Sequence, residues 1–237
     1  MSDDKRPVVV GWVKNSLIDY PGMVATVLFL SGCNLRCPFC HNPGVVHGRT
    51  GECHAWEDIV GFLRRRRGLI DGVVLTGGEP TLHGGELAGM IRRMRELGYR
   101  VKLDTNGMKP EVIEMLAPDY LALDVKTVPR GYSRWLGAGG IDVDASLEQS
   151  VEICRRMGRN AEVRITAAPR ILDDVIIGEI AKLIEGVSLV VVQPFRADAE
   201  LLDPSFSRLE PPSMETLRQW REVLGEHVEE CRIRTRW

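Results

Sequence analysis

Cys33-Asn34-Leu35-Arg36-Cys37-Pro38-Phe39-Cys40 places three thiols in one short segment, with the spacing C-x3-C-x2-C. The segment comes soon after the apolar run Val24–Leu30, which is typical of a buried strand, so the thiols are predicted on the loop that leaves that strand. Three clustered thiolates suit an iron–sulfur cluster, and a cluster with only three protein ligands keeps one iron open for chemistry. A structural zinc site completed by His41 or His47 needs the same thiols, so the spacing alone leaves both metals open.

The chain has 237 residues, 44% of them hydrophobic, and a net charge of −2 from 31 basic and 33 acidic side chains. This composition predicts an ordinary globular core and does not favour nucleic-acid binding. The opening residues Met1–Arg6 are polar, and no apolar run approaches the roughly 18 residues of a membrane-spanning helix. We therefore expect a cytoplasmic protein without a membrane partner.

Short apolar runs alternate along the chain with amphipathic segments. Strands are predicted at Val24–Leu30, Gly72–Thr76, Arg100–Asp104, Tyr120–Val125, Ala161–Thr166, Ser188–Val192 and Cys231–Trp237, and helices at Trp56–Arg67, Gly85–Leu97, Pro110–Leu116, Leu147–Met157, Val175–Ile184 and Met214–Leu224. Strands separated by single helices indicate right-handed βαβ crossovers in a parallel sheet. A closed eight-unit barrel typically needs about 250 residues. The α/β pattern therefore favours an incompletely closed parallel (β/α)6 barrel over a flat doubly wound sheet.

Polar motifs follow the predicted strands at the ends where parallel α/β folds form their sites. Thr76-Gly-Gly-Glu-Pro80 follows the second strand, Asp104-Thr-Asn-Gly107 follows the third, and Asp124-Val-Lys126 follows the fourth, while Arg164 lies on the fifth. We expect these motifs at one rim of the sheet, beside the thiols. Each also has a purely structural interpretation, because Gly-Gly and Asn-Gly are common in turns and Asp124 can simply pair with Lys126.

With these motifs in place, the chain resembles the radical S-adenosylmethionine superfamily. Within it, the sequence is most similar to the glycyl-radical-enzyme activases, in particular the anaerobic ribonucleoside-triphosphate reductase activating proteins. The residues that carry this likeness are Leu17–Gly22, Ser31–Pro43, Leu103–Gly107, Leu123–Thr127, Tyr132–Gly137 and Glu162–Pro169. The resemblance implies a single radical SAM domain over residues 1–237, with its core at about 24–225 and short extensions at both ends.

The resemblance also implies a set of site residues. Cys33, Cys37 and Cys40 would hold one [4Fe–4S] cluster, which is the catalytic centre and binds S-adenosylmethionine at its open iron. The residues implied to contact that cofactor are Gly77, Gly78, Glu79, Asp104, Thr105 and Asn106 toward the methionine ammonium, Lys126 toward its carboxylate, Phe39 and His41 toward the adenine, and Arg164 on the fifth strand. Charged groups there would bind by charge-assisted hydrogen bonds.

The function that the resemblance implies is that of an anaerobic oxidoreductase. An electron from a flavodoxin or ferredoxin-type donor would drive cleavage of S-adenosylmethionine to a 5′-deoxyadenosyl radical. That radical would abstract hydrogen from a backbone glycine of a partner glycyl radical enzyme, an anaerobic ribonucleoside-triphosphate reductase. The loops that would face a substrate carry no motif, so a pyruvate formate-lyase-type activase and a small-molecule enzyme such as a carboxydeazaguanine synthase stay open. A non-catalytic, zinc-stabilised binding module is the alternative from another class.

Two further features receive structural interpretations. Cys53, Cys154 and Cys231 are far apart and show no C-x2-C spacing, so we expect isolated thiols and no second cluster. The basic run Arg64–Arg67 invites a docking role for an acidic electron donor. It ends a predicted helix that runs back from the thiol loop, where positive charge suits the helix dipole, so we expect an ordinary solvated helix end.

Overall fold

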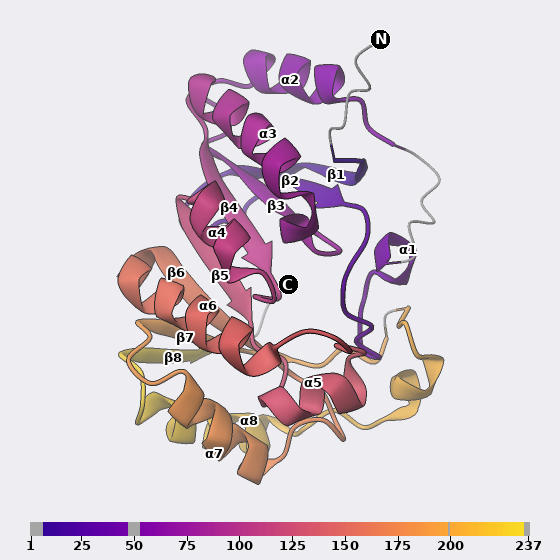
Figure 1. Ribbon diagram of the computed structural model, residues 1–237, viewed down its shortest axis with the longest axis vertical. Coiled ribbons are helices and arrows are strands. Elements are labelled where there is room, and N and C mark those ends of the chain that lie inside the picture. Colours follow the sequence, from indigo (N-terminus) through magenta and orange to yellow (C-terminus); the bar gives the residue numbers. More distant parts are fainter. Residues whose placement is uncertain (1–6, 47–52, 199, 235–237) are drawn as a thin grey trace. The chain divides into compact units, whose positions relative to one another are not determined.

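The computed structural model describes residues 7–46, 53–198 and 200–234 (Figure 1). The chain divides into two compact units. Unit 1 comprises Met1–Cys33, Gly44–Thr105 and Glu111–Tyr120, and unit 2 comprises Asn34–Pro43, Asn106–Pro110 and Leu121–Trp237. The thiol loop therefore begins in unit 1 and continues in unit 2.

Unit 1 is built on four strands. β2 (Ala25–Leu30), β3 (Gly72–Gly77) and β4 (Arg100–Thr105) are parallel, and β1 (Val9–Ser16) pairs antiparallel with β2. The helices that follow these strands are α1 (Pro43–Val46), α2 (Trp56–Arg65), the short 3-10 helix η1 (Pro80–His83), α3 (Gly84–Glu96) and α4 (Pro110–Leu116). Val73, Val74 and Leu75 of β3 are fully buried, as expected for a strand covered on both faces.

Unit 2 contains the second group of parallel strands, whose pairings follow sequence order. They are β5 (Tyr120–Asp124), β6 (Ala161–Ala167), β7 (Leu189–Pro194) and β8 (Glu230–Ile233). Its helices are α5 (Pro129–Trp135), α6 (Val143–Met157), α7 (Asp174–Leu183) and α8 (Met214–Gly225), with 3-10 turns at Gly158–Asn160 and Pro204–Arg208. Helices α7 and α8 lie next to each other (Figure 1), and the Trp220 indole donates a 2.7 Å hydrogen bond from α8 to Asp174 on α7.

Within each unit the strands pair in sequence order, from β1 to β4 in unit 1 and from β5 to β8 in unit 2. Among the described strands, β1 pairs with β2 alone and β8 with β7 alone, so hydrogen bonds do not close the sheet. Six parallel strands, β2 to β7, are each followed by a helix. The predicted incompletely closed parallel α/β fold is confirmed, while the single-domain assignment stays a prediction.

Most predicted elements differ from the observed ones only at their ends, but β1, the four-residue α1, α5 and the short 3-10 turns were missed. β1 was not predicted because its exposed edge weakens the alternation of apolar residues. α5 was not predicted because it is short; it begins at Pro129, where a fixed φ and a missing N–H suit the first helical turn. α6 begins four residues earlier than predicted, since the Asp142 carboxylate accepts a hydrogen bond from the Ala145 amide and caps it.

The predicted C-terminal strand is confirmed as β8, which ends at Ile233; residues 235–237 of that prediction lie outside the described residues, as does His47. No described helix has the length and apolar character needed to cross a membrane.

Candidate functional site

In unit 1, the backbone directly before Cys33 is hydrogen-bonded to the Gly-Gly-Glu turn. The Gly78 amide donates to the Leu30 carbonyl at 2.9 Å, and the Glu79 amide donates to the Gly32 carbonyl at 2.8 Å. A Cβ added to Gly78 would lie 1.8 Å from the Gly32 carbonyl oxygen. The family resemblance implies that Gly77 and Gly78 contact the cofactor. In the structure, the missing side chain of Gly78 also allows its backbone to pack against the Gly32 backbone, directly before Cys33.

The Glu79 carboxylate is buried, and three donors share one of its oxygens. Oε1 accepts hydrogen bonds from the Thr81 amide at 3.0 Å, the Thr81 hydroxyl at 2.6 Å and the Thr105 hydroxyl at 2.7 Å. The two threonines are buried as well. A buried carboxylate is costly unless it is hydrogen-bonded, so this arrangement fixes the end of β3 to the end of β4.

Asp104, the next predicted contact in unit 1, forms an ion pair with a buried lysine. Lys102 Nζ lies 2.8 Å from Asp104 Oδ1 and donates a 2.7 Å hydrogen bond to the Asp19 carbonyl. The same ammonium lies 5.9 Å from the centre of the Tyr120 ring. The Lys102 side chain is only 2% exposed, so Asp104 is held by a charge partner that the motif did not indicate.

In unit 2, the remainder of the thiol loop is a tight turn. The Cys40 amide donates to the Cys37 carbonyl at 3.0 Å, and the Asn42 amide lies 3.4 Å from the Cys40 sulfur, where it can donate. Cys37 and Phe39 are buried, and Cys40 is partly exposed. The segment before the Pro204 turn lies along this loop, because the Leu202 and Asp203 amides donate to the Cys40 and Pro38 carbonyls at 3.1 and 2.9 Å.

Lys126 stands beside this turn, inside a cluster of charges. Its Nζ lies 5.9 Å from the Phe39 ring centre and 3.4 Å from Asp124 Oδ2, while Arg164 Nε donates to Asp124 Oδ1 at 2.7 Å. The ion pair that the sequence left open as a structural interpretation is therefore present. Burial alone would raise the pKa of Asp124, but Arg164 and then Lys126 outweigh it and lower the pKa to about 2.

The electrostatics of Lys126 also reflect the thiols. Burial alone would lower its pKa, but the charges of Asp124, Cys37 and Cys40 raise it above its usual value. The fully buried Tyr132 on α5 accepts a 3.1 Å hydrogen bond from the Lys126 amide, and burial raises the pKa of its phenol. The result is a fixed cation facing two thiols.

The other predicted contacts in unit 2 are placed by single hydrogen bonds. The Asn106 amide nitrogen donates to Asn34 Oδ1 at 2.8 Å, so the loop after β4 is joined to the thiol loop. The Ser150 hydroxyl donates to the Gly107 carbonyl at 2.7 Å and so joins the loop after β4 to helix α6. His41 is exposed, and its Nε2 lies 3.3 Å from the Arg196 carbonyl.

Four side chains that the motifs did not single out thus support the predicted ones: Asn34, Thr81, Lys102 and Tyr132. Asn34, Thr81 and Lys102 lie within two positions of Cys33, Glu79 and Asp104, so their neighbourhood to the motifs was a sequence signal. Tyr132 begins the segment Tyr132–Gly137 that carries part of the resemblance, but its contact with Lys126 depends on a helix that was not predicted.

The donor set fits an iron–sulfur cluster better than a structural zinc site, which needs four protein ligands. The described part of the chain has no preassembled group of three or more His, Cys, Asp and Glu side chains, so the fit rests on chemistry within each unit. The only histidine in the loop turn, His41, is engaged toward the Arg196 carbonyl. A lysine whose positive charge faces Cys37 and Cys40 suits thiolates that hold an electron-rich centre.

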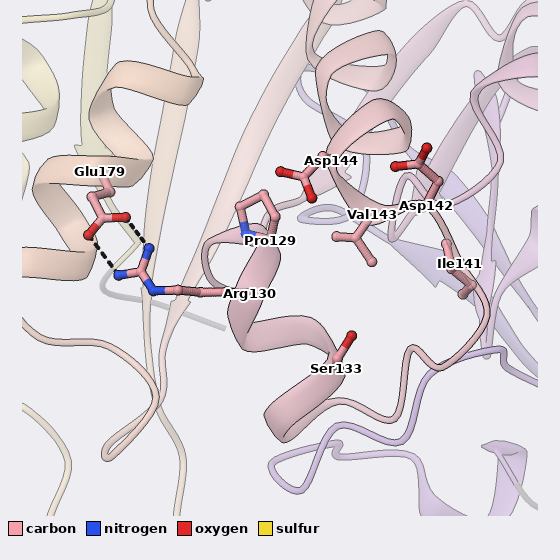
Figure 2. Close-up of a pocket in the computed structure, with 8 residues that line it drawn as sticks. All are labelled: Pro129, Arg130, Ser133, Ile141, Asp142, Val143, Asp144 and Glu179. Atoms are coloured by element: carbon pink, nitrogen blue, oxygen red, sulfur yellow. Dashed lines mark hydrogen bonds and ion pairs between the residues drawn. The ribbon is translucent and has the colours of Figure 1, made fainter.

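A separate pocket lies in unit 2 and contains none of the predicted site residues. It has a volume of about 480 Å³ and is lined by residues of α5, the start of α6, and α7: Pro129, Arg130, Ser133, Ile141, Asp142, Val143, Asp144 and Glu179. Figure 2 shows Arg130 reaching across to Glu179, with which it forms a two-bond ion pair. The pocket's other two carboxylates flank the start of α6.

Comparison with known proteins agrees with this chemistry. The sequence profile of the Radical SAM superfamily matches residues 27–184. A provisionally named glycyl-radical enzyme activating enzyme of Methanocaldococcus jannaschii is 32% identical over 238 residues, which cover 97% of each chain. The pyruvate formate-lyase-activating enzyme of Clostridium pasteurianum is 31% identical over 66% of this chain and 67% of its own.

A relative of different chemistry and a solved structure also match. The 7-carboxy-7-deazaguanine synthase of Thermococcus kodakarensis is 26% identical over 82% of this chain and 80% of its own. The crystal structure of QueE from Escherichia coli shares the fold, with a TM-score of 0.60 at 16% identity over 97% of this chain and 94% of that one. The chain is an enzyme of the Radical SAM superfamily, whose members use a [4Fe–4S] cluster and S-adenosylmethionine.

Proposed function

We propose that the chain is a glycyl-radical-enzyme activase. The observation that carries this proposal is the match to the activating enzyme of Methanocaldococcus jannaschii over 97% of both chains. The partial match to a pyruvate formate-lyase-activating enzyme supports the same class. Of the glycyl radical enzymes, we propose an anaerobic ribonucleoside-triphosphate reductase as the target, because the motifs from Leu17 to Pro169 resemble its activating proteins.

In this proposal Cys33, Cys37 and Cys40 ligate the cluster. When bound, the cluster and S-adenosylmethionine supply a 5′-deoxyadenosyl radical once an electron arrives. The chain's own residues bind and orient that cofactor: Gly77, Gly78, Glu79, Asp104, Thr105 and Asn106 at its ammonium end, Lys126 at its carboxylate end, Phe39 and His41 near the adenine, and Arg164 from the fifth parallel strand. The Gly-Gly-Glu turn is hydrogen-bonded to the Leu30 and Gly32 carbonyls, directly before Cys33, which supports a joint role for the turn and this thiol.

The charges of the site support this assignment of residues to the two ends of the cofactor. Lys126 keeps its proton because Asp124 and the thiols surround it, so it can pair with a carboxylate at any physiological pH. Asp104 offers a carboxylate that already pairs with one ammonium, that of Lys102 at 2.8 Å, and such a group suits the ammonium of the cofactor. We further propose that the 237 residues act as one domain, in the cytoplasm, where a flavodoxin or ferredoxin-type carrier keeps the cluster reducible.

Electron paramagnetic resonance tests the target directly. The reconstituted, reduced protein is mixed with S-adenosylmethionine and the reductase, and a glycyl radical signal is expected to appear. A reductase whose radical glycine is replaced by alanine is the matched control and gives no signal. If S-adenosylmethionine is cleaved but the wild-type reductase gains no radical, the reductase is not the target.

A second candidate is a small-molecule enzyme of the 7-carboxy-7-deazaguanine synthase type. The match to the Thermococcus kodakarensis synthase over most of both chains favours it. The two candidates separate in one assay, because a synthase yields a carboxylated deazaguanine product, detected by mass spectrometry, without any protein substrate. Formation of that product, together with the absence of a glycyl radical, would replace the activase proposal.

A further inference from the structure

The proposed chemistry needs one electron for each cleavage of S-adenosylmethionine, and that electron must reach the cluster from outside it. The isolated cysteines Cys53, Cys154 and Cys231 offer no second C-x2-C set for a relay cluster in the chain. A separate carrier must therefore lose one electron as the cluster gains one, with no bond made or broken between the two proteins. The carrier has to approach the loop that holds the thiols.

Within unit 2, the outer side of this loop meets the C-terminal end of α5. Arg36, which directly precedes Cys37, is exposed, and its amide donates a 2.7 Å hydrogen bond to the Leu136 carbonyl. A Cβ added to Gly137 would lie 3.4 Å from the Arg36 Cβ. Arg36 is thus held next to the last turn of α5 and the glycine-rich segment 137–140, whose small residues let another protein approach closely.

That end of α5 presents a second exposed cation beside an aromatic ring. The Arg134 guanidinium lies 4.9 Å from the centre of the half-buried Trp135 ring. Among the described residues, no carboxylate forms an ion pair with Arg134, in contrast to Arg130 one turn earlier, which is paired with Glu179 (Figure 2). Arg134 therefore keeps a positive charge available to a partner.

The sequence around this surface is depleted of negative charge. Neither the segment 34–43 nor the segment 125–141, both of unit 2, contains an Asp or Glu, although the whole chain has 33 acidic residues against 31 basic ones. Both segments contain proposed cluster neighbours, Cys37 and Cys40 in the first and Lys126 in the second. The exposed guanidinium groups of Arg36 and Arg134 at this end of α5 are the complement of an acidic protein surface.

We propose that Arg36, Arg134 and Trp135 form a carrier face, which docks an acidic one-electron carrier protein so that its electron enters the cluster on the Cys37 side. This assignment rests on the proposed function and adds the place and the charge of its electron donor. The basic run on α2 does not serve this role: Arg64 and Arg65 end the helix that leads to the start of β3, whereas Cys33 follows the other end of β2, which runs parallel to β3.

The test measures docking and electron entry without any target enzyme. Reduced flavodoxin, an acidic carrier, is mixed with the reconstituted holoenzyme, and the amplitude and rate of the reduced-cluster paramagnetic signal are recorded together with the dissociation constant at rising salt. Three proteins are compared: the wild type, the double variant Arg36→Glu/Arg134→Glu, and the matched control Arg64→Glu/Arg65→Glu. The two variants carry the same change in net charge. The single variant Arg134→Glu, which leaves the thiol loop untouched, guards against a folding defect at Arg36.

If the carrier face docks flavodoxin, the double variant is expected to lower the rate of cluster reduction by flavodoxin and the affinity for flavodoxin by about tenfold or more at low salt. Arg134→Glu alone is expected to lower both in part. The difference between wild type and variants is expected to narrow as salt screens the charges. The control stays close to wild type. Dithionite, a small reductant, reduces the cluster of every variant to the same endpoint, and S-adenosylmethionine binds equally.

An unchanged flavodoxin rate in the double variant, or an equal loss in the control, would overturn the carrier face. It would also be overturned if flavodoxin reduced the double variant normally while the dithionite-reduced variant lost transfer of the radical to a target enzyme, because the face would then dock the target. A wrong choice of target enzyme leaves the flavodoxin readout intact, so the two proposals fail separately.

Discussion

The Thr105 hydroxyl donates a 2.7 Å hydrogen bond to Glu79 Oε1, although 26 positions separate these two residues in the chain. Both side chains are buried, and the bond joins the ends of two neighbouring parallel strands. Glu79 of the Gly-Gly-Glu motif and Thr105 of the Asp-Thr-Asn-Gly motif are therefore joined within unit 1. A change in either is expected to affect the other.

Replacing Thr105 with Val removes this donor at nearly constant volume. Because a buried acceptor then loses a partner, the free energy of unfolding is expected to fall by about 1–3 kcal/mol. Chemical denaturation of the apo protein measures this loss, and calorimetry with S-adenosylmethionine on the holoenzyme is expected to show weaker binding. Thr105→Ser keeps the hydroxyl and is expected to restore most of both; if it behaves like Val, the hydrogen bond is not what matters.

Gly78 is predicted to tolerate no side chain. A Cβ at Gly78 would lie 1.8 Å from the Gly32 carbonyl oxygen, so an alanine must push apart the two backbones next to Cys33. We expect Gly78→Ala to lower the free energy of unfolding by about 1–3 kcal/mol or more and to reduce iron uptake on reconstitution. Gly89→Ala on α3, where nothing lies within 4 Å of the added Cβ, is the control and is expected to be neutral or stabilising. Equal effects of the two substitutions would contradict this account.

The thiols are expected to separate into two classes. Changing Cys33, Cys37 or Cys40 to Ala should abolish the broad visible absorption of the reconstituted cluster, because each supplies one ligand. Burial raises the pKa of Cys154 to about 12 and that of Cys231 to about 11, so neither is a ready thiolate. Cys231→Ser is therefore expected to keep full iron content, and a variant of the first class that still assembled a catalytic cluster would remove that cysteine from the ligand set.

The order of the strands and the loops that carry polar motifs could be predicted from the sequence because both depend on local patterns. Apolar runs such as Val73–Leu75 have no other stable environment than a covered sheet, and parallel strands bring their ends to one edge. The glycines were also found, but with an incomplete reason: Gly78 is constrained by the Gly32 backbone, a contact between segments about 45 positions apart.

The charge partners could not be predicted, since they depend on register and on elements with weak signals. Lys102 lies two positions before Asp104 on β4, and its sequence context does not distinguish it from an exposed strand lysine. In the folded protein its side chain is only 2% exposed. Tyr132 reaches the Lys126 amide only because α5 forms, and that helix has seven residues and no periodic pattern long enough to detect. Arg36 likewise reads as a loop arginine until Leu136 is placed beside it.

The last prediction concerns acid stability and rests on Asp124. Its pKa is lowered from 3.8 to about 2 in the folded protein because Arg164 and Lys126 outweigh the effect of burial. A carboxyl whose pKa is depressed by folding binds protons more readily in the unfolded chain. Its contribution to stability is therefore fully present above about pH 4 and is lost as the pH falls from there toward 2.

The comparison of wild type with Asp124→Asn isolates this contribution from the other carboxyl groups, because they titrate in both proteins. At pH 7 the variant is expected to be less stable by about 2 kcal/mol or more, since it also leaves two partly buried cations, Lys126 and Arg164, without their carboxylate. The gap should narrow as the pH falls from about 4 to 2, when the wild-type carboxyl takes up its proton. Urea denaturation at several pH values measures it, and a gap that stays constant over this range would show that the Arg164–Asp124–Lys126 cluster does not set the pKa of Asp124.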